Sequence, residues 1–141
     1  PKAAALTALQ LRFITPTEIK SKGEMVERPD FGPLFARIRD RVANIYERQH
    51  SRPLKIDFRG MGERAQLIRM TQCEVRTVEV DRRSSRTGQE HSIGGFIGEA
   101  SYEGALGEFV PYLAAAEHTG VGRQTVWGKG EIRVIPAGES K

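Results

Sequence analysis

Cysteine is nearly absent from this sequence. Cys73 is the only one among 141 residues, so the chain cannot form an internal disulfide. Because Cys73 lies in a run where apolar and polar residues alternate, we expect a buried thiol in a reducing cytosol. A structural zinc site needs several cysteines or a paired histidine arrangement, and the sequence offers neither. It therefore predicts no metal site and no cofactor.

Long hydrophobic runs are also missing. No apolar stretch approaches the roughly 18 residues that a membrane-spanning helix requires, and nothing at the N-terminus resembles a signal peptide. We therefore expect a cytoplasmic protein without a membrane partner. The chain is long enough for one domain with a real core, and no linker or repeat divides it. It starts at Pro1 without an initiator methionine, which is typical of truncation or of processing.

Candidates for acid–base chemistry are few. The only histidines are His50, His91 and His118, and none has a nucleophile or an orienting carboxylate at motif spacing. The Gly-x-Ser-x-Gly motif of serine hydrolases is absent as well. We therefore expect surface or helix-capping roles for the three histidines and predict no catalytic residue within this chain.

Basic residues are in modest excess. The 22 lysines and arginines outweigh 18 acidic residues, which gives a net charge of +4 at pH 7. This charge allows a polyanionic partner without demanding one. Arginine dominates the cations, which favours bidentate contacts with phosphate groups.

Hydrophobic spacing predicts a definite order of elements. The first strand covers residues 9–13, because Leu9, Leu11 and Phe13 alternate with polar residues. Asp30 then stands at the N-cap of a helix whose apolar residues recur every three or four positions. The other expected elements are a helical turn at 57–66, a bulged strand at 67–83, a strand at 96–102, a helix at 106–118 and a strand at 126–135. This order is typical of the α+β ferredoxin-like (βαββαβ) fold, an antiparallel four-stranded sheet with both helices on one face.

The stretch HTGVGRQTVWGKG at 118–130 lies between the second long helix and the last strand. Glycine lets backbone approach a ligand, and successive N–H groups form a concavity that suits phosphate oxygens. A Walker loop does not fit, because five residues separate Gly122 from Gly128 and Gly130 follows Lys129. Two interpretations stay open, an anion-binding loop or a helix C-cap at Gly120 followed by a turn.

The candidate phosphate-binding residues offer a cation, a backbone donor or an aromatic ring. They are Gly120, Gly122, Arg123, Trp127, Gly128, Lys129 and Gly130 in the glycine-rich loop, and Arg82, Arg83 and Arg86 near the tip of the predicted hairpin. Trp127 either stacks on an unpaired base or packs into the core. The alternative for the hairpin arginines is a solvated surface, which we also expect for Arg37, Arg41, Asn44 and Arg48 on the first helix.

Five short motifs follow one another along nearly the whole chain. They are Phe13-Ile14-Thr15-Pro16, the helix with Phe31, Leu34 and Arg37, then Arg83-Ser84-Ser85-Arg86, Gly94-Gly95-Phe96-Ile97-Gly98, and the run 120–130. Each is weak alone. Together they resemble the C-terminal domain of the CRISPR-associated endoribonucleases that process precursor CRISPR RNA, a family of the RAMP superfamily.

The resemblance implies two ferredoxin-like domains in tandem, with the glycine-rich loop of the second helping to hold the repeat RNA. It also implies metal-independent RNA cleavage by a ribose 2′-hydroxyl, with a histidine of the N-terminal domain as the usual catalyst. We therefore expect residues 1–141 to be a single RAMP domain, the C-terminal half of a longer protein that binds CRISPR repeat RNA. The alternative is a non-catalytic subunit that docks onto other CRISPR-associated proteins. His118, beside the loop, is the one candidate here for a catalytic or RNA-positioning role.

Overall fold

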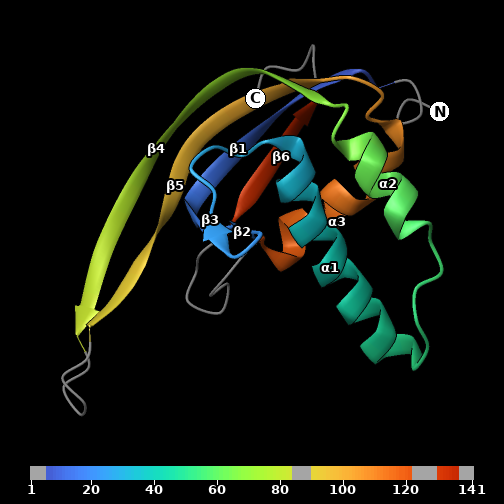
Figure 1. Cartoon of the computed structure of the whole chain (residues 1–141), viewed down its shortest axis with the longest axis horizontal. Coiled ribbons are helices and arrows are strands. Elements are labelled where there is room, and N and C mark those ends of the chain that lie inside the picture. Colours follow the sequence, from blue (N-terminus) through green and yellow to red (C-terminus); the bar gives the residue numbers. More distant parts are fainter. Residues whose placement is uncertain (1–5, 84–89, 122–129, 137–141) are drawn as a thin grey trace.

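The structure is a computed structural model that describes residues 6–83, 90–121 and 130–136 (Figure 1). In chain order its elements are β1 (Ala8–Thr17), β2 (Lys20–Ser21), β3 (Glu24–Met25), α1 (Phe31–His50), α2 (Phe58–Ala65), β4 (Arg69–Arg83), β5 (Glu90–Glu103), a 3-10 turn (Gly107–Phe109), α3 (Val110–Thr119) and β6 (Ile132–Pro136). Among the described helices, none combines the length and the apolar character that crossing a bilayer demands.

Four strands form one sheet in the order β4-β5-β1-β6. Every neighbouring pair in it is antiparallel. The sheet curves around α1 and α3, which lie together on one of its faces (Figure 1). Because β5 lies between β1 and β4, the chain follows the split βαβ arrangement. The predicted α+β ferredoxin-like fold is confirmed.

The core lies between that face of the sheet and the helices. Leu9, Leu11 and Phe13 of β1 are all buried, as their alternation predicts. The ring of Phe35 meets that of Phe109 edge-on, with ring centroids 4.7 Å apart. Burying a side chain of this size stabilises a fold by about 1.5–3 kcal/mol. These contacts fix the helices against the sheet.

The buried hydroxyl of Tyr102 ties β5 to the segment before α1. It donates a hydrogen bond of 2.5 Å to the carbonyl oxygen of Pro29. Burial raises the pKa of Tyr102 far above that of an exposed tyrosine. The phenol therefore stays protonated and keeps this bond over the whole neutral range.

Helix α1 starts where the sequence predicts. Asp30 is its N-cap residue, although the Asp30 side chain makes no capping hydrogen bond. The helix ends at His50. The C-cap residue, Ser51, has a left-handed backbone conformation (φ 55°), and its N–H donates a hydrogen bond to the carbonyl of Glu47. The predicted turn at 57–66 is confirmed as α2.

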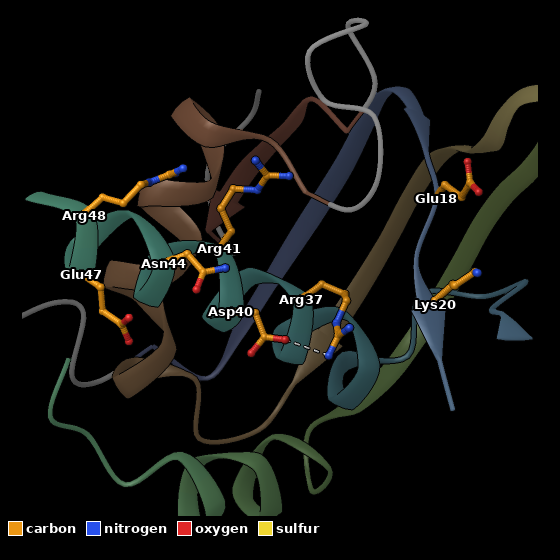
Figure 2. A pocket seen from close by; sticks show the side chains of 8 residues that line it. All are labelled: Glu18, Lys20, Arg37, Asp40, Arg41, Asn44, Glu47 and Arg48. Carbon is orange, nitrogen blue, oxygen red and sulfur yellow. Dashed lines mark ion pairs between the residues drawn. The ribbon is translucent and has the colours of Figure 1, made fainter. Parts of the chain in front are cut away.

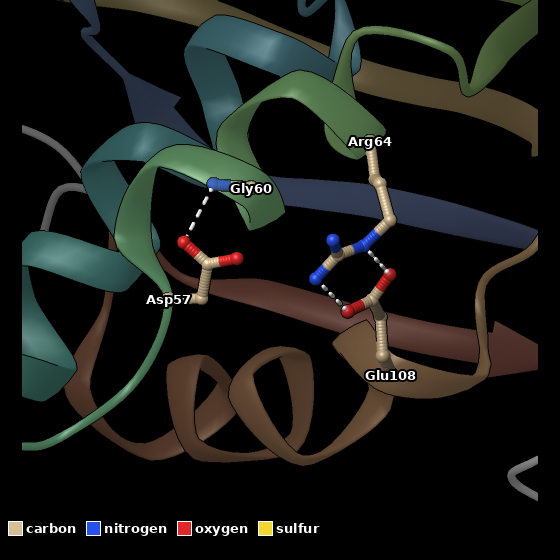
Figure 3. A network of polar contacts seen from close by, with 4 residues as sticks. All are labelled: Asp57, Gly60, Arg64 and Glu108. Carbon is tan, nitrogen blue, oxygen red and sulfur yellow. Dashed lines mark hydrogen bonds and ion pairs between the residues drawn. The ribbon is translucent and has the colours of Figure 1, made fainter.

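Two polar contacts fix α2 (Figure 3). The Asp57 carboxylate caps the helix by accepting a 3.0 Å hydrogen bond from the N–H of Gly60. At the other end, Arg64 donates two hydrogen bonds, 2.7 and 2.9 Å long, to the carboxylate of Glu108. The hydrogen bond to Glu108 raises the pKa of the Arg64 guanidinium. This pair joins α2 to the 3-10 turn before α3.

The structure corrects several details of the sequence analysis. Cys73 is only partly buried, because β4 is an edge strand of the sheet. The register shift of β4 lies between Met70 and Gln72, earlier than the change of apolar phase around Val78 indicates. The hairpin of β2 and β3 was not predicted, since it pairs just two residues from each strand. Strand β6 starts at Ile132, and the first part of the predicted strand falls outside the described residues.

Candidate nucleic-acid interface

Gly120 ends helix α3. Its φ of 80° is one that L residues seldom adopt, and its N–H donates a 2.9 Å hydrogen bond to the carbonyl of Ala116. The C-cap interpretation of Gly120 is therefore confirmed. This bond occupies the N–H of Gly120, so that donor is not free to bind a phosphate.

Gly130 closes the other side of the loop. Its carbonyl accepts a 2.9 Å hydrogen bond from the N–H of Val121, and its own N–H donates one of 2.9 Å to the carbonyl of Pro16. The φ of Gly130 is +83°, and a Cβ atom there would clash with the carbonyl oxygen of Val121. Only glycine fits this position without a shift of the backbone. The other predicted site residues of the loop lie outside the described residues; they are Gly122, Arg123, Trp127, Gly128 and Lys129.

The end of β1 anchors the loop. Two hydrogen bonds add to the one at Pro16. The N–H of Ile14 donates a hydrogen bond of 2.8 Å to the carbonyl of Glu131, and the N–H of Glu131 donates one of 2.9 Å to the hydroxyl of Thr15. The motif Phe13-Ile14-Thr15-Pro16 thus holds the C-terminal side of the loop in place. The anchoring role of this motif was not predicted from the sequence, because its partners lie more than a hundred positions away.

The predicted hairpin is a long two-stranded ribbon. Strand β4 pairs with β5 out to Arg82 opposite His91 and Arg83 opposite Glu90. Figure 1 shows this ribbon running well past the end of β1. The side chains of Arg82 and Arg83, and all of Arg86, fall outside the described part of the chain.

Glycines shape the root of the ribbon. Gly95 (φ +136°) lies so close to Thr17 that a Cβ atom would overlap the Thr17 backbone. Gly98 (φ +130°) stands equally close to the backbone of Glu74. The Gly-Gly-Phe-Ile-Gly motif is therefore a requirement of close strand contact at this point.

The two predicted cationic sites lie near each other at their bases only. Phe96 pairs with both Thr17 and Thr77, so the ribbon leaves the sheet one residue from the Pro16 anchor. From Thr77 the strand continues for six residues to Arg83, about 20 Å at 3.3 Å per residue. The backbone of Arg83 therefore lies far along the ribbon from the point where it leaves the sheet.

Neither of the two histidines whose side chains the structure describes joins a catalytic group. His118 is exposed in the last turn of α3, and the ring of His50 lies 4.1 Å from that of Tyr46 at the end of α1. The side chain of His91 falls outside the described residues. Within the described ranges, no three residues of the His, Cys, Asp or Glu type gather as metal ligands would.

A groove of about 820 Å³ lies along the outer face of α1 (Figure 2). We call it the α1 groove. It is lined by Glu18, Lys20, Arg37, Asp40, Arg41, Asn44, Glu47 and Arg48. A solvated surface was predicted for the α1 residues Arg37, Arg41, Asn44 and Arg48. The position of Glu18 and Lys20 opposite them was not predicted, because no local pattern relates the two segments.

Comparison with known families gives the class of the protein. Residues 11–132 match the family model of the CRISPR-associated endoribonuclease Cas6. This match covers most of the chain, which therefore belongs to the Cas6 family. No curated protein matches the sequence.

Solved structures of Cas6 share the fold. Thermus thermophilus Cas6 (TTHB231) superposes with a TM-score of 0.70 at 20% identity, over 95% of this chain and 57% of that one. A product complex of Cas6 (TTHA0078) superposes with a TM-score of 0.62 at 21% identity, over 94% of this chain and 51% of that one. A chain of a Cas6-RT-Cas1–Cas2 complex superposes with a TM-score of 0.67 at 13% identity, over 99% of this chain and 15% of that one. The chain thus spans about half the length of the two Cas6 proteins.

Proposed function

We propose that this chain is the RNA-binding C-terminal half of a Cas6 endoribonuclease that processes precursor CRISPR RNA. Its glycine-rich loop holds the repeat RNA, and the preceding half supplies the catalytic residues. The observation that carries the proposal is the closed base of the loop, where Val121 and Gly130 are bonded to each other and Gly130 is bonded to Pro16. These bonds hold both ends of the loop in place, so the ends need little ordering when a ligand binds.

The hydrogen bonds at the base also indicate which residues would contact RNA. Gly120, Val121 and Gly130 direct their N–H groups to carbonyl oxygens of the protein. They therefore shape the loop. The donors for phosphate oxygens would come from residues 122–129, where the sequence has Gly122, Arg123, Gly128 and Lys129.

The hairpin arginines would add a second contact with the RNA backbone. The ribbon of β4 and β5 holds Arg82 and Arg83 about 17 and 20 Å beyond Thr77, by the strand rise given above. An RNA bound at the loop would have to extend along the ribbon to meet them. Trp127 remains a candidate for stacking on an unpaired base.

The test is a fluorescence-anisotropy titration of labelled CRISPR repeat RNA with the wild-type chain and with an Arg123→Ala, Lys129→Ala double variant. We expect the variant to bind on the order of a hundredfold or more weakly, since each of the two phosphate contacts with a cation contributes about 1.5–3 kcal/mol. Its binding should also depend less steeply on salt. Unchanged affinity in the variant would contradict the role of the loop.

A matched control comes from the other end of β1. An Arg59→Ala, Arg69→Ala double variant removes the same charge, and its side chains are exposed members of surface ion pairs. Arg69 pairs with Glu103, which pairs with Ala8 at the start of β1. That is about 30 Å from Thr17 along the strand. This variant should bind RNA nearly as the wild type does.

A second candidate is a protein-interaction subunit. The fold match to a Cas6-RT-Cas1–Cas2 complex favours it. A subunit that binds only proteins should show no RNA affinity that weakens with salt. The same titration therefore separates the two functions.

A further inference from the structure

The α1 groove is a second cationic surface, separate from the glycine-rich loop. Arg37, Arg41, Asn44 and Arg48 project from one face of α1, and Lys20 lies across from them (Figure 2). Their spacing follows successive turns of the helix, about 6 Å apart, and the row extends over about 16 Å. A row of that length exceeds the size of a single small anion.

Charge in the groove is positive overall. Four cationic side chains face three acidic ones. One of the acids, Asp40, is already shared by two guanidinium groups, with Arg37 at 2.9 Å and Arg39 at 3.1 Å. In the part of the chain that the structure describes, neither Lys20 nor Arg48 has an ion-pair partner. These two exposed cations remain available to an anionic ligand.

The inner wall of the groove also holds an unused donor. The Nε atom of Arg37 is buried and has no hydrogen-bond partner within the described residues. A buried donor without an acceptor costs the fold about 1–3 kcal/mol. Because this atom is enclosed, a ligand in the groove would meet only the outer part of the Arg37 guanidinium, which pairs with Asp40.

The groove adjoins the base of the glycine-rich loop. Gly130 is bonded to the carbonyl of Pro16, and Glu18, on one bank of the groove, follows two residues later. Two residues span at most about 7 Å of extended chain. The residue that anchors Gly130 and one bank of the groove are therefore neighbours along the chain.

We propose that the α1 groove binds the phosphate backbone of the RNA strand that continues from the glycine-rich loop, without reading its bases. The spaced cations, the neutral donor Asn44 and the position beside the loop all suit a repeating chain of phosphates. This inference rests on the proposed function, since it needs an RNA held at the loop.

The test compares two RNAs, a long one that extends past the loop on both sides and a short one that fills the loop alone. The protein variant is Lys20→Ala, Arg48→Ala. Both side chains are exposed and have no ion-pair partner among the described residues, so the fold should be retained. We expect about tenfold weaker binding of the long RNA, with a log–log salt slope shallower by about 1.4 for two single-strand phosphates. Binding of the short RNA should not change.

Each other outcome overturns the inference in a recognisable way. If the variant and the wild type bind the long RNA equally, the groove does not contact RNA and is left for a protein partner. If the variant weakens both RNAs alike, its effect is not local to the strand beyond the loop. If only Arg123→Ala, Lys129→Ala weakens binding, the proposed function stands and the groove inference falls. If the wild type binds neither RNA, both fall. The Arg59→Ala, Arg69→Ala variant serves again as the charge-matched control.

Discussion

Gly130 is the residue on which the geometry of the glycine-rich loop depends most directly. Its positive φ and its contact with the Val121 carbonyl oxygen leave no room for a side chain. We predict that Gly130→Ala lowers the free energy of unfolding by about 2 kcal/mol or more, because it adds a steric clash to the cost of the left-handed conformation. Urea denaturation followed by circular dichroism measures the loss.

Gly23 provides the matched control for this substitution. It has the same φ of +83°, and a Cβ atom there would meet nothing within 4 Å. Gly23→Ala should therefore cost only the conformational part, about 1 kcal/mol. Equal losses in the two variants would show that the contact with Val121 does not constrain the loop.

Tyr102 makes the stability of the fold dependent on alkaline pH. Burial raises its pKa in the folded chain, so on unfolding the phenol becomes easier to ionise. The stabilisation is fully present below the ordinary tyrosine pKa of about 10 and is lost above it, by up to about 1.4 kcal/mol per pH unit. Tyr102→Phe should lose about 1 kcal/mol at neutral pH, with the hydrogen bond to Pro29. Between pH 9 and pH 11 the free energy of unfolding of Tyr102→Phe should fall less than that of the wild type.

Urea unfolding at several pH values measures this difference. Tyr112, whose pKa burial also raises, is present in both proteins and so does not affect the comparison. Parallel stability curves for the wild type and Tyr102→Phe above pH 10 would contradict the assignment.

At the scale of elements, two helix N-caps that look alike in sequence differ in structure. The Asp57 carboxylate accepts a hydrogen bond from Gly60, whereas the Asp30 carboxylate caps nothing. We predict that Asp57→Ala destabilises the protein by about 1 kcal/mol and that Asp30→Ala does so far less. Thermal melts of the two variants side by side check this, and an equal loss would contradict it.

The sequence predicts the long elements better than the short ones. Helix α1 and the first part of strand β1 were located correctly because their apolar residues repeat over several turns or alternations, and Phe31, Leu34 and Leu11 are indeed buried. The prediction that this strand stops at Thr15-Pro16 is wrong, because β1 continues to Thr17, which pairs with Phe96. The hairpin of β2 and β3 pairs too few residues to leave a pattern. The helix predicted at 106–118 starts with a 3-10 turn, since Pro111 shortens the regular part.

The candidate site was predictable only in part, for a physical reason. Composition alone points to the glycine-rich loop, because glycines and cations there are neighbours in sequence. The α1 groove depends on Lys20 and the cations of α1 lining one hollow although they lie far apart in sequence, and no local pattern encodes such an arrangement. The anchoring role of Thr15 was hidden in the same way, since its partner Glu131 is distant in sequence.

At the scale of the whole molecule, the chain is one ferredoxin-like unit of the Cas6 family. It covers about half of the Cas6 structures that share its fold. Its surface features gather at one end of the sheet, where the closed base of the loop, the root of the ribbon and the α1 groove surround the end of β1. One continuous RNA path past these three features would account for their proximity.

The most direct test of this account is the salt dependence of repeat-RNA binding by the wild-type chain. Dissociation constants should be measured by anisotropy over a series of salt concentrations. We predict saturable binding with a log–log slope of about −2 or steeper, which corresponds to at least three single-strand phosphates. Absence of binding, or an affinity that does not change with salt, would contradict the claim that this chain holds RNA by its phosphate backbone.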